Sequence, residues 1–162
     1  MRASELLKRQ HRHVEELFGQ VLKRRDTRRR KSLMMEIANE LEAHTSIEEN
    51  VFYPAVKKIG TKKAEDMVLE AYEEHHVVKI VLAELPWVDP EADSFGAKMT
   101  VLKDLIGHHC DEEEREMFPM AEKRLGASRS QQLAEEIAAQ ANGWDRPLRR
   151  RRGNLAAKIV LA

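Results

Sequence analysis

Two short segments of this chain carry the same pattern of residues. The first, HTSIEENVFYP, spans residues 44–54, and the second, HCDEEEREMFP, spans residues 109–119. Each begins with His, has Glu-Glu at its fifth and sixth places, and ends with an aromatic residue followed by Pro. The offset of 65 residues between His44 and His109 also relates Glu48 to Glu113 and Pro54 to Pro119. We therefore expect two similar halves related by a pseudo-twofold axis within one bundle.

Apolar residues recur with a period close to 3.6 along most of the chain, which predicts amphipathic helices. Four apolar stripes are present, from Leu7 to Val21, Leu33 to Val51, Val68 to Leu85, and Phe95 to Met117. Gly60 and Gly126 follow the second and fourth stripes, as expected where helices end. Short connections favour antiparallel neighbours. The sequence therefore predicts an all-α fold, an up-down-up-down four-helix bundle over residues 1–126. A short C-terminal helix reaching about Asn142 and a basic tail would complete residues 127–162.

Composition narrows the classes of function. The chain has 162 residues, 35% of them charged, and a formal net charge of zero, so no overall field attracts nucleic acid or anionic membranes. Cys110 is the one cysteine, which excludes an internal disulfide and suits a reducing cytoplasm. The N-terminus lacks the apolar run of a secretory signal, and no segment approaches the length of a membrane span. We expect a cytoplasmic protein.

Each apolar stripe also carries histidine, and two of the stripes add glutamate. Residues at i and i+4 share a helix face, so His44 with Glu48 and His109 with Glu113 each present a nitrogen beside a carboxylate. Buried carboxylates are costly unless they are paired or bound to metal. Imidazole with carboxylate suits iron, manganese or zinc, and iron is typical of oxygen chemistry. Two such carboxylates can bridge two metal ions, leaving positions for an oxo or hydroxo bridge. The predicted metal ligands are His11, His44, Glu48, His75, His109 and Glu113.

Two neighbouring pairs of histidines require a choice. The strict 65-residue offset from His11 selects His76, but apolar residues follow His75 at the same intervals that they follow His11. His75 is therefore preferred, and His109 is preferred over His108 because it matches the repeat. The glutamates at 49 and 114 are expected to face solvent, where either can hydrogen-bond a ligand. Tyr53 is expected in the core, within reach of a bound ligand.

Four segments together resemble the hemerythrin-like, or HHE cation-binding, domains. They are LLKRQHRHVEELF, ELEAHTSIEENVFYP, EEHHVVKIVLAEL and HHCDEEEREMFP, in that order. The resemblance covers residues 5 to about 125 and implies a four-helix bundle around a non-haem di-iron centre, with the six ligands named above. Oxygen-carrying hemerythrins have a fifth histidine one turn after the ligand on the third helix, where this chain has Lys79. The resemblance therefore favours binding of O₂, peroxide or nitric oxide, with catalase-like peroxide removal or oxygen or iron sensing, over simple oxygen carriage.

Two other functions compete with this interpretation. A ferritin-like oxidase needs Glu-x-x-His on two helices. Glu73 and His76 form one such pair, but the fourth helix has none. An interaction module is the alternative, because basic clusters at Lys23–Lys31 and Arg146–Lys158 can contact nucleic acid or an anionic surface. No aromatic residues are interleaved with these clusters, so a solvated loop and tail are the simpler interpretation.

Overall fold

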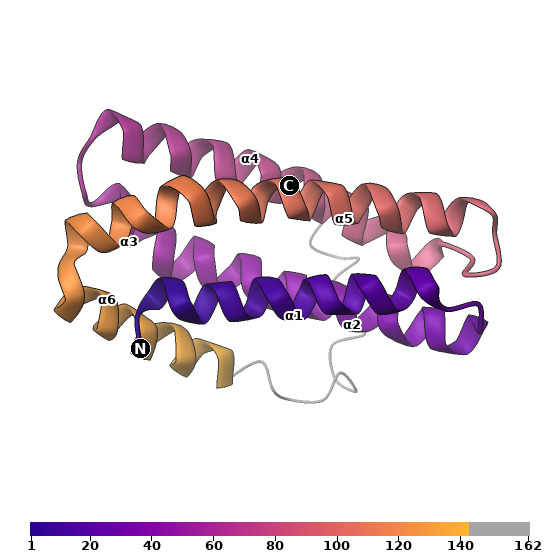
Figure 1. The fold of residues 1–162 in the computed structure, drawn as a ribbon. Coiled ribbons are helices and arrows are strands. Elements are labelled where there is room, and N and C mark those ends of the chain that lie inside the picture. The colour runs from indigo at the N-terminus through magenta and orange to yellow at the C-terminus, as the bar shows by residue number, and fades with distance from the viewer. Residues whose placement is uncertain (143–162) are drawn as a thin grey trace.

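Four long helical rods run alternately up and down the long axis of the molecule (Figure 1). This computed structural model describes residues 1–142. The first rod is α1 (Ala3–Lys23) and the third is α4 (Lys62–Glu84), which ends in the 3₁₀ turn η2 (Leu85–Trp87). The all-α, up-down-up-down bundle predicted from the apolar stripes is confirmed. The predicted basic tail lies outside the described residues.

The second and fourth rods are each interrupted by a π-helical turn. The second consists of α2 (Thr27–Ile47), η1 (Glu48–Phe52) and α3 (Tyr53–Lys57). The fourth consists of α5 (Ser94–Glu112), η3 (Glu113–Met117) and the first part of α6 (Phe118–Asn142). The apolar spacing predicted continuous helices and gave no indication of these turns. Each one begins at the glutamate of a repeated segment.

Local chemistry sets where the helices begin and end. Asp26 Oδ1 accepts a hydrogen bond from the Arg29 N–H at the start of α2, and Thr61 Oγ1 accepts one from Ala64 at the start of α4. Gly60 and Gly126 adopt φ values of 72° and 75°, a left-handed conformation that costs glycine little. Both glycines therefore end their helices as the sequence predicted.

The helix that follows Gly126 packs back on one end of the bundle. Its Leu133 and Ile137 are fully buried, and the Ser130 hydroxyl accepts a hydrogen bond from the Ala3 N–H at 3.1 Å. This segment therefore covers the end of the bundle at which the chain begins (Figure 1).

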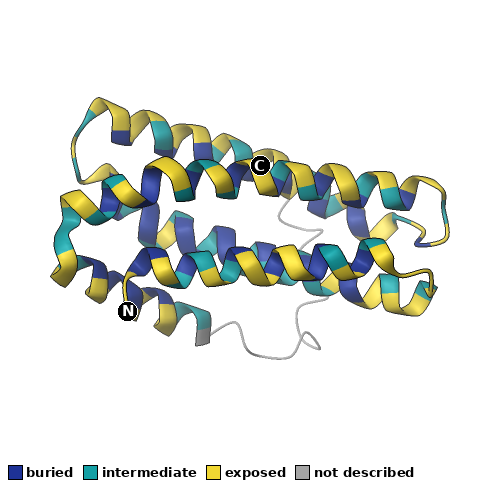
Figure 2. Cartoon of the chain, in the orientation of Figure 1, coloured by how far each residue is buried: buried dark blue, intermediate teal, exposed yellow. Residues whose placement is uncertain are grey.

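Buried residues face the interior on all four rods (Figure 2) and form two apolar clusters. One cluster contains Leu7 and Ala71, and the other contains Val14 and Val78. Each predicted histidine ligand lies between the clusters on its own helix, as His11 lies between Leu7 and Val14. A polar layer thus crosses the middle of an otherwise apolar core. Within residues 1–142, none of the helices combines the length and the apolarity needed to cross a bilayer.

Candidate metal centre

The structure brings the six predicted ligands together in the polar layer. All are buried, with exposed fractions between 0% and 6%: His11, His44, Glu48, His75, His109 and Glu113. The competing histidines at positions 76 and 108 are exposed, as is His13. Burial therefore agrees with the choice of His75 over His76 and of His109 over His108.

Each π-helical turn begins at the glutamate of a His/Glu pair. The Tyr53 N–H bonds to the Glu48 carbonyl, and the Phe118 N–H bonds to the Glu113 carbonyl, each across five residues. Because such a turn contains one more residue than an α-helical turn, it shifts the buried face by one position. Tyr53 and Phe118 consequently point into the core, directly beside the six predicted ligands.

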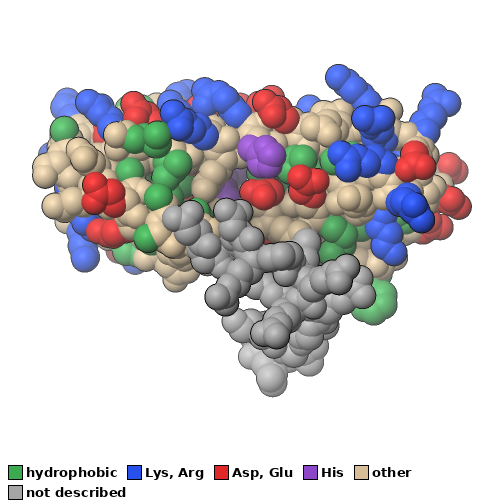
Figure 3. All heavy atoms as spheres, turned by 90° about the horizontal axis from the view of Figure 1, so that it is seen from below, with side chains coloured by type: hydrophobic (Ala, Val, Ile, Leu, Met, Phe, Trp, Pro, Cys, Tyr) green, Lys and Arg blue, Asp and Glu red, His purple; other side chains and the backbone are tan. Residues whose placement is uncertain are grey.

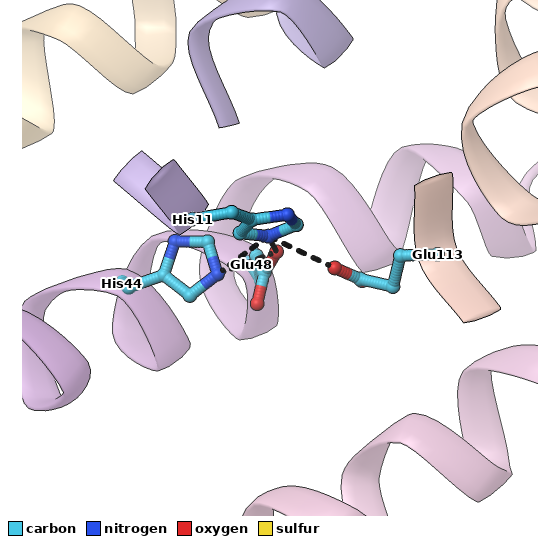
Figure 4. A group of neighbouring side chains, drawn as sticks. All are labelled: His11, His44, Glu48 and Glu113. Carbon is cyan, nitrogen blue, oxygen red and sulfur yellow. Dashed lines mark hydrogen bonds and ion pairs between the residues drawn. The ribbon is translucent and has the colours of Figure 1, made fainter. Parts of the chain in front are cut away.

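The first group of ligand atoms comes from His11, His44, Glu48 and Glu113 (Figure 4). His11 Nε2 lies 3.1 Å from His44 Nε2 and 3.4 Å from Glu113 Oε2. His44 Nε2 lies 3.1 Å from Glu48 Oε1. The nitrogens and oxygens of this group all lie within 4.8 Å of one another, close enough to surround one ion.

The second group consists of Glu48, His75 and His109. His75 Nε2 lies 3.1 Å from His109 Nε2 and 3.2 Å from Glu48 Oε2. Glu48 therefore turns Oε1 towards one histidine pair and Oε2 towards the other. Glu113 differs, because its Oε2 lies between His11 at 3.4 Å and His109 at 3.6 Å. Glu48 is thus shared by both groups, each of which could hold a metal ion.

Two of the four imidazole rings are oriented by glutamates at the edge of the cluster. His11 Nδ1 lies 2.9 Å from Glu114 Oε1, and His75 Nδ1 lies 3.0 Å from Glu49 Oε1. Because a carboxylate only accepts hydrogen bonds, each Nδ1 carries the proton. Glu49 and Glu114 were expected to face solvent and to be able to hydrogen-bond a ligand. Both are partly buried, and each holds one imidazole ring by such a bond.

The other two rings are held by residues that the sequence analysis missed. His44 Nδ1 lies 2.9 Å from Gln10 Oε1, and His109 Nδ1 lies 2.6 Å from Glu74 Oε2. Gln10 and Glu74 directly precede His11 and His75 in the sequence. The sequence did contain a signal for them, because a polar residue stands directly before the predicted ligand on the first helix and on the third.

This arrangement suits a cation. With the protons on Nδ1, the four Nε2 atoms direct lone pairs into one small space. Imidazole nitrogens bind divalent metals at about 2.1 Å, so two nitrogens on neighbouring positions of one ion lie about 3 Å apart. The separation of 3.1 Å within each histidine pair matches that value. Without an ion, each pair requires a shared proton to avoid repulsion between lone pairs.

Two carboxylate oxygens within the cluster are left without a hydrogen-bond donor. Glu48 Oε1 and Glu113 Oε2 are buried and accept no hydrogen bond of acceptable geometry. The remaining oxygen of Glu113 accepts a bond from the Tyr53 hydroxyl at 2.9 Å, which also lies 3.2 Å from His75 Nε2. Because a buried anionic oxygen is costly without a partner, the two free oxygens fit metal ligands.

The charges within the cluster shift its protonation in the metal-free protein. Burial raises the pKa of Glu113, and repulsion from Glu48 raises it further. Burial also acts on Glu48, but the histidines that surround its carboxylate, His44 first among them, hold its pKa well below the usual value. Burial lowers the pKa of His44, whereas the neighbouring carboxylates of Glu48 and Glu74 outweigh burial and raise the pKa of His109 well above its usual value.

Comparison with known proteins identifies the family of this chain. Residues 2–121 match the family model described as the hemerythrin HHE cation binding domain. The chain belongs to this family. The HHE domain therefore accounts for nearly the whole described bundle, including all six clustered residues.

Solved and curated relatives agree with this assignment. A crystal structure of a hemerythrin HHE cation binding domain-containing protein, the Rv2633c homolog from Mycobacterium kansasii, superposes with a TM-score of 0.76. It is 26% identical, and the match covers 89% of this chain and 87% of that one. The uncharacterized protein Rv2633c of Mycobacterium tuberculosis is 29% identical over 120 residues, covering 74% of this chain and 71% of that protein.

Other relatives are longer than this chain. A DNA nickase from a Nostoc species is 26% identical over 139 residues, which is 86% of this chain but 39% of the nickase. An uncharacterized hemerythrin-like protein of Schizosaccharomyces pombe is 29% identical over 98 residues, or 60% of this chain and 48% of that protein. The chain thus spans less than half the length of these two relatives. For this chain the comparisons support an HHE domain with a buried His/Glu cluster that is able to bind metal.

Proposed function

We propose that this HHE domain holds two iron ions, one at each histidine pair, and binds O₂, peroxide or nitric oxide there, with catalase-like removal of hydrogen peroxide as its activity. The observation that carries the proposal is the position of Glu48, whose two oxygens face the two pairs separately. Iron at this site would supply reversible exchange between ferrous and ferric states beside open coordination positions.

The protein surroundings support chemistry with a small ligand. Apolar clusters on both sides of the polar layer limit the entry of bulk water. The Tyr53 hydroxyl lies at the centre of the cluster, where it can donate to a bound ligand or keep Glu113 in position. A pocket lined by His109 and Glu113 gives small molecules access from the surface. These features favour a ligand of two or a few atoms.

The position of Lys79 favours peroxide removal over oxygen transport. Oxygen-carrying hemerythrins have a fifth histidine at this position. In this chain the Lys79 ammonium lies outside the cluster, 2.5 Å from Glu49 Oε1. The protein therefore offers one fewer imidazole to the second ion, which leaves an additional position for an exogenous ligand. In the proposed reaction two molecules of hydrogen peroxide give two of water and one of O₂, so no outside reductant is consumed.

Loading the full chain with Fe²⁺ under argon tests the proposal. We expect two iron ions per chain by elemental analysis and, after peroxide is added, one O₂ released for every two peroxides consumed. His44→Ala should lower the iron content and the rate of O₂ release, whereas His13→Ala, which changes an exposed histidine on α1, should leave both unchanged. Peroxide loss no faster than with metal-free protein would count against the activity, and iron below one ion per chain would count against the centre.

A second candidate is contact with nucleic acid, which the Nostoc DNA nickase brings into consideration. We propose as its surface the exposed arginines 24, 25, 28 and 29, at the turn between α1 and α2. Figure 3 shows Lys and Arg side chains gathered at this end of the molecule, but Asp and Glu side chains lie among them. Mixed charge weakens a phosphate-binding surface. A gel-shift assay at several salt concentrations, with these arginines changed to alanine, would reveal whether the turn binds DNA.

A further inference from the structure

A second group of metal-binding side chains lies on the surface, outside the buried cluster. Glu74 on α4 and His108 and Glu112 on α5 place one ligand atom each within 4.8 Å of one another. His108 Nε2 lies 3.4 Å from Glu112 Oε1 and 3.9 Å from Glu74 Oε1. The exposed fractions of these side chains are 69% for His108, 34% for Glu112 and 24% for Glu74. One imidazole with two carboxylates suits a divalent transition metal, and the exposure implies weak, exchangeable binding.

A pocket joins this surface group to the buried centre. Its lining includes Glu74 and Glu112 from the surface group and His109 and Glu113 from the cluster. The pocket volume is about 80 Å³, which accommodates a few water molecules. Glu113 is 2% exposed and its Oε2 has no hydrogen-bond donor, so the lining also includes a buried residue with an unpaired carboxylate oxygen. This oxygen is independent of the surface group and also favours a cation.

Glu74 links the two places directly. Its Oε2 accepts the hydrogen bond from His109 Nδ1, while its Oε1 faces His108. An ion at the surface group is therefore separated from a buried ligand by a single carboxylate. The exposed Glu70 also lines the pocket, and acidic residues at an opening raise the local concentration of cations.

The other half of the bundle lacks this group. The residue that holds His44 is Gln10, which is neutral, whereas the residue that holds His109 is Glu74. The positions that the repeat relates to His108 and Glu112 are Ala43 and Ile47. The surface group is thus not required by the repeated architecture, and its three side chains are a specific feature of the α4–α5 side.

We propose that Glu74, His108 and Glu112 form a loading site that captures Fe²⁺ at the surface and delivers it through the pocket to His109 and Glu113. The inference rests on the proposed iron centre. The ion exchanges water and surface ligands for buried ones without change of oxidation state, so no other reactant is needed.

Stopped-flow mixing of the metal-free full chain with Co²⁺ tests the loading role, since Co²⁺ coordination is visible by absorption. The double variant His108→Ala/Glu112→Gln should take up the same final number of ions as the unmodified protein, but about tenfold more slowly. The control variant His13→Ala/Glu135→Gln changes an exposed histidine and an exposed glutamate elsewhere, and should match the unmodified rate. Equal rates for both double variants would overturn the loading site.

The final number of ions bound per chain distinguishes failure of the loading site from failure of the proposed iron centre. If the unmodified protein takes up no ion at the buried centre, the iron centre is wrong and the loading role falls with it. A direct measurement uses the imidazole NMR signals of the Zn²⁺-loaded protein during titration with Mn²⁺. Signals of His108 should broaden at Mn²⁺ concentrations that leave His13 sharp. Equal broadening of the two would also overturn the proposal.

Discussion

The two repeated segments share a backbone but place different side chains beside the cluster. Both continue from a His/Glu pair into a π-helical turn, and in both the turn brings the following aromatic residue into the core. The first segment supplies Tyr53, whose hydroxyl reaches across to Glu113, whereas the second supplies Phe118, whose ring stacks on His11 at 5.7 Å. A symmetric scaffold thus holds equivalent candidate ligands in unequal surroundings, and the two glutamates have different neighbours.

The largest expected difference between the halves lies in these glutamates. Glu48→Gln removes the oxygen charge that both histidine pairs face, so we expect metal content to fall below one ion per chain. Glu113→Gln affects a residue that Tyr53 already holds on one side, and should retain at least one ion. Elemental analysis after loading and dialysis measures both, with circular dichroism as the control for folding. Equal metal loss in the two variants would show that the two carboxylates act alike.

Replacing the aromatic residue of the first segment should have a smaller effect on the metal centre than replacing Glu48. Tyr53→Phe makes the first segment resemble the second and leaves Glu113 Oε1 without its donor, which costs about 1–3 kcal/mol of stability in the metal-free protein. Urea unfolding measures this change. Leu133→Ala, in the helix that covers the end of the bundle, is a useful control. It should also lower stability but leave the optical spectrum of the metal-loaded protein unchanged, whereas Tyr53→Phe should alter that spectrum.

The smallest expected difference between the two halves is in the number of protons released when a metal binds. In the metal-free protein the pKa of His109 is raised, because the neighbouring carboxylates of Glu48 and Glu74 outweigh burial, whereas burial lowers the pKa of His44. At neutral pH His109 therefore carries a proton that a metal must displace, and metal affinity should fall as the pH decreases. Calorimetry in buffers of different ionisation heat counts the protons released. Glu74→Gln should reduce that number, and Gln10→Ala should not.

The sequence was sufficient to predict the bundle and the clustered residues. Apolar spacing predicted four helices because the 3.6-residue period is a local property of each segment. The same spacing identified His75, although the strict repeat offset pointed to His76, which is exposed. Burial follows the helix face on which a residue lies. Small shifts in connection length between the two halves alter the offset without altering that face.

Other features required the packed structure. The π-helical turns were not predicted, because the hydrogen bonds from Tyr53 and Phe118 across five residues leave no distinct mark in an apolar pattern. Gln10 and Glu74 belong to helices other than those of the histidines they hold, so their partners depend on how neighbouring rods align. The pocket likewise arises from the packing of α4 against the fourth rod.

By itself, the sequence determined which residues can enter the core, since hydrophobic periodicity runs along each helix and the repeated His/Glu pairs lie on the buried faces of two of them. Tertiary structure decided which ligand atoms meet, which oxygen of Glu48 faces which histidine pair, and which half of the bundle opens to the surface. The physical reason is the range along the chain over which each kind of interaction acts. Periodicity governs residues within one turn of each other, whereas contacts of about 3 Å between separate helices depend on the register in which those helices pack.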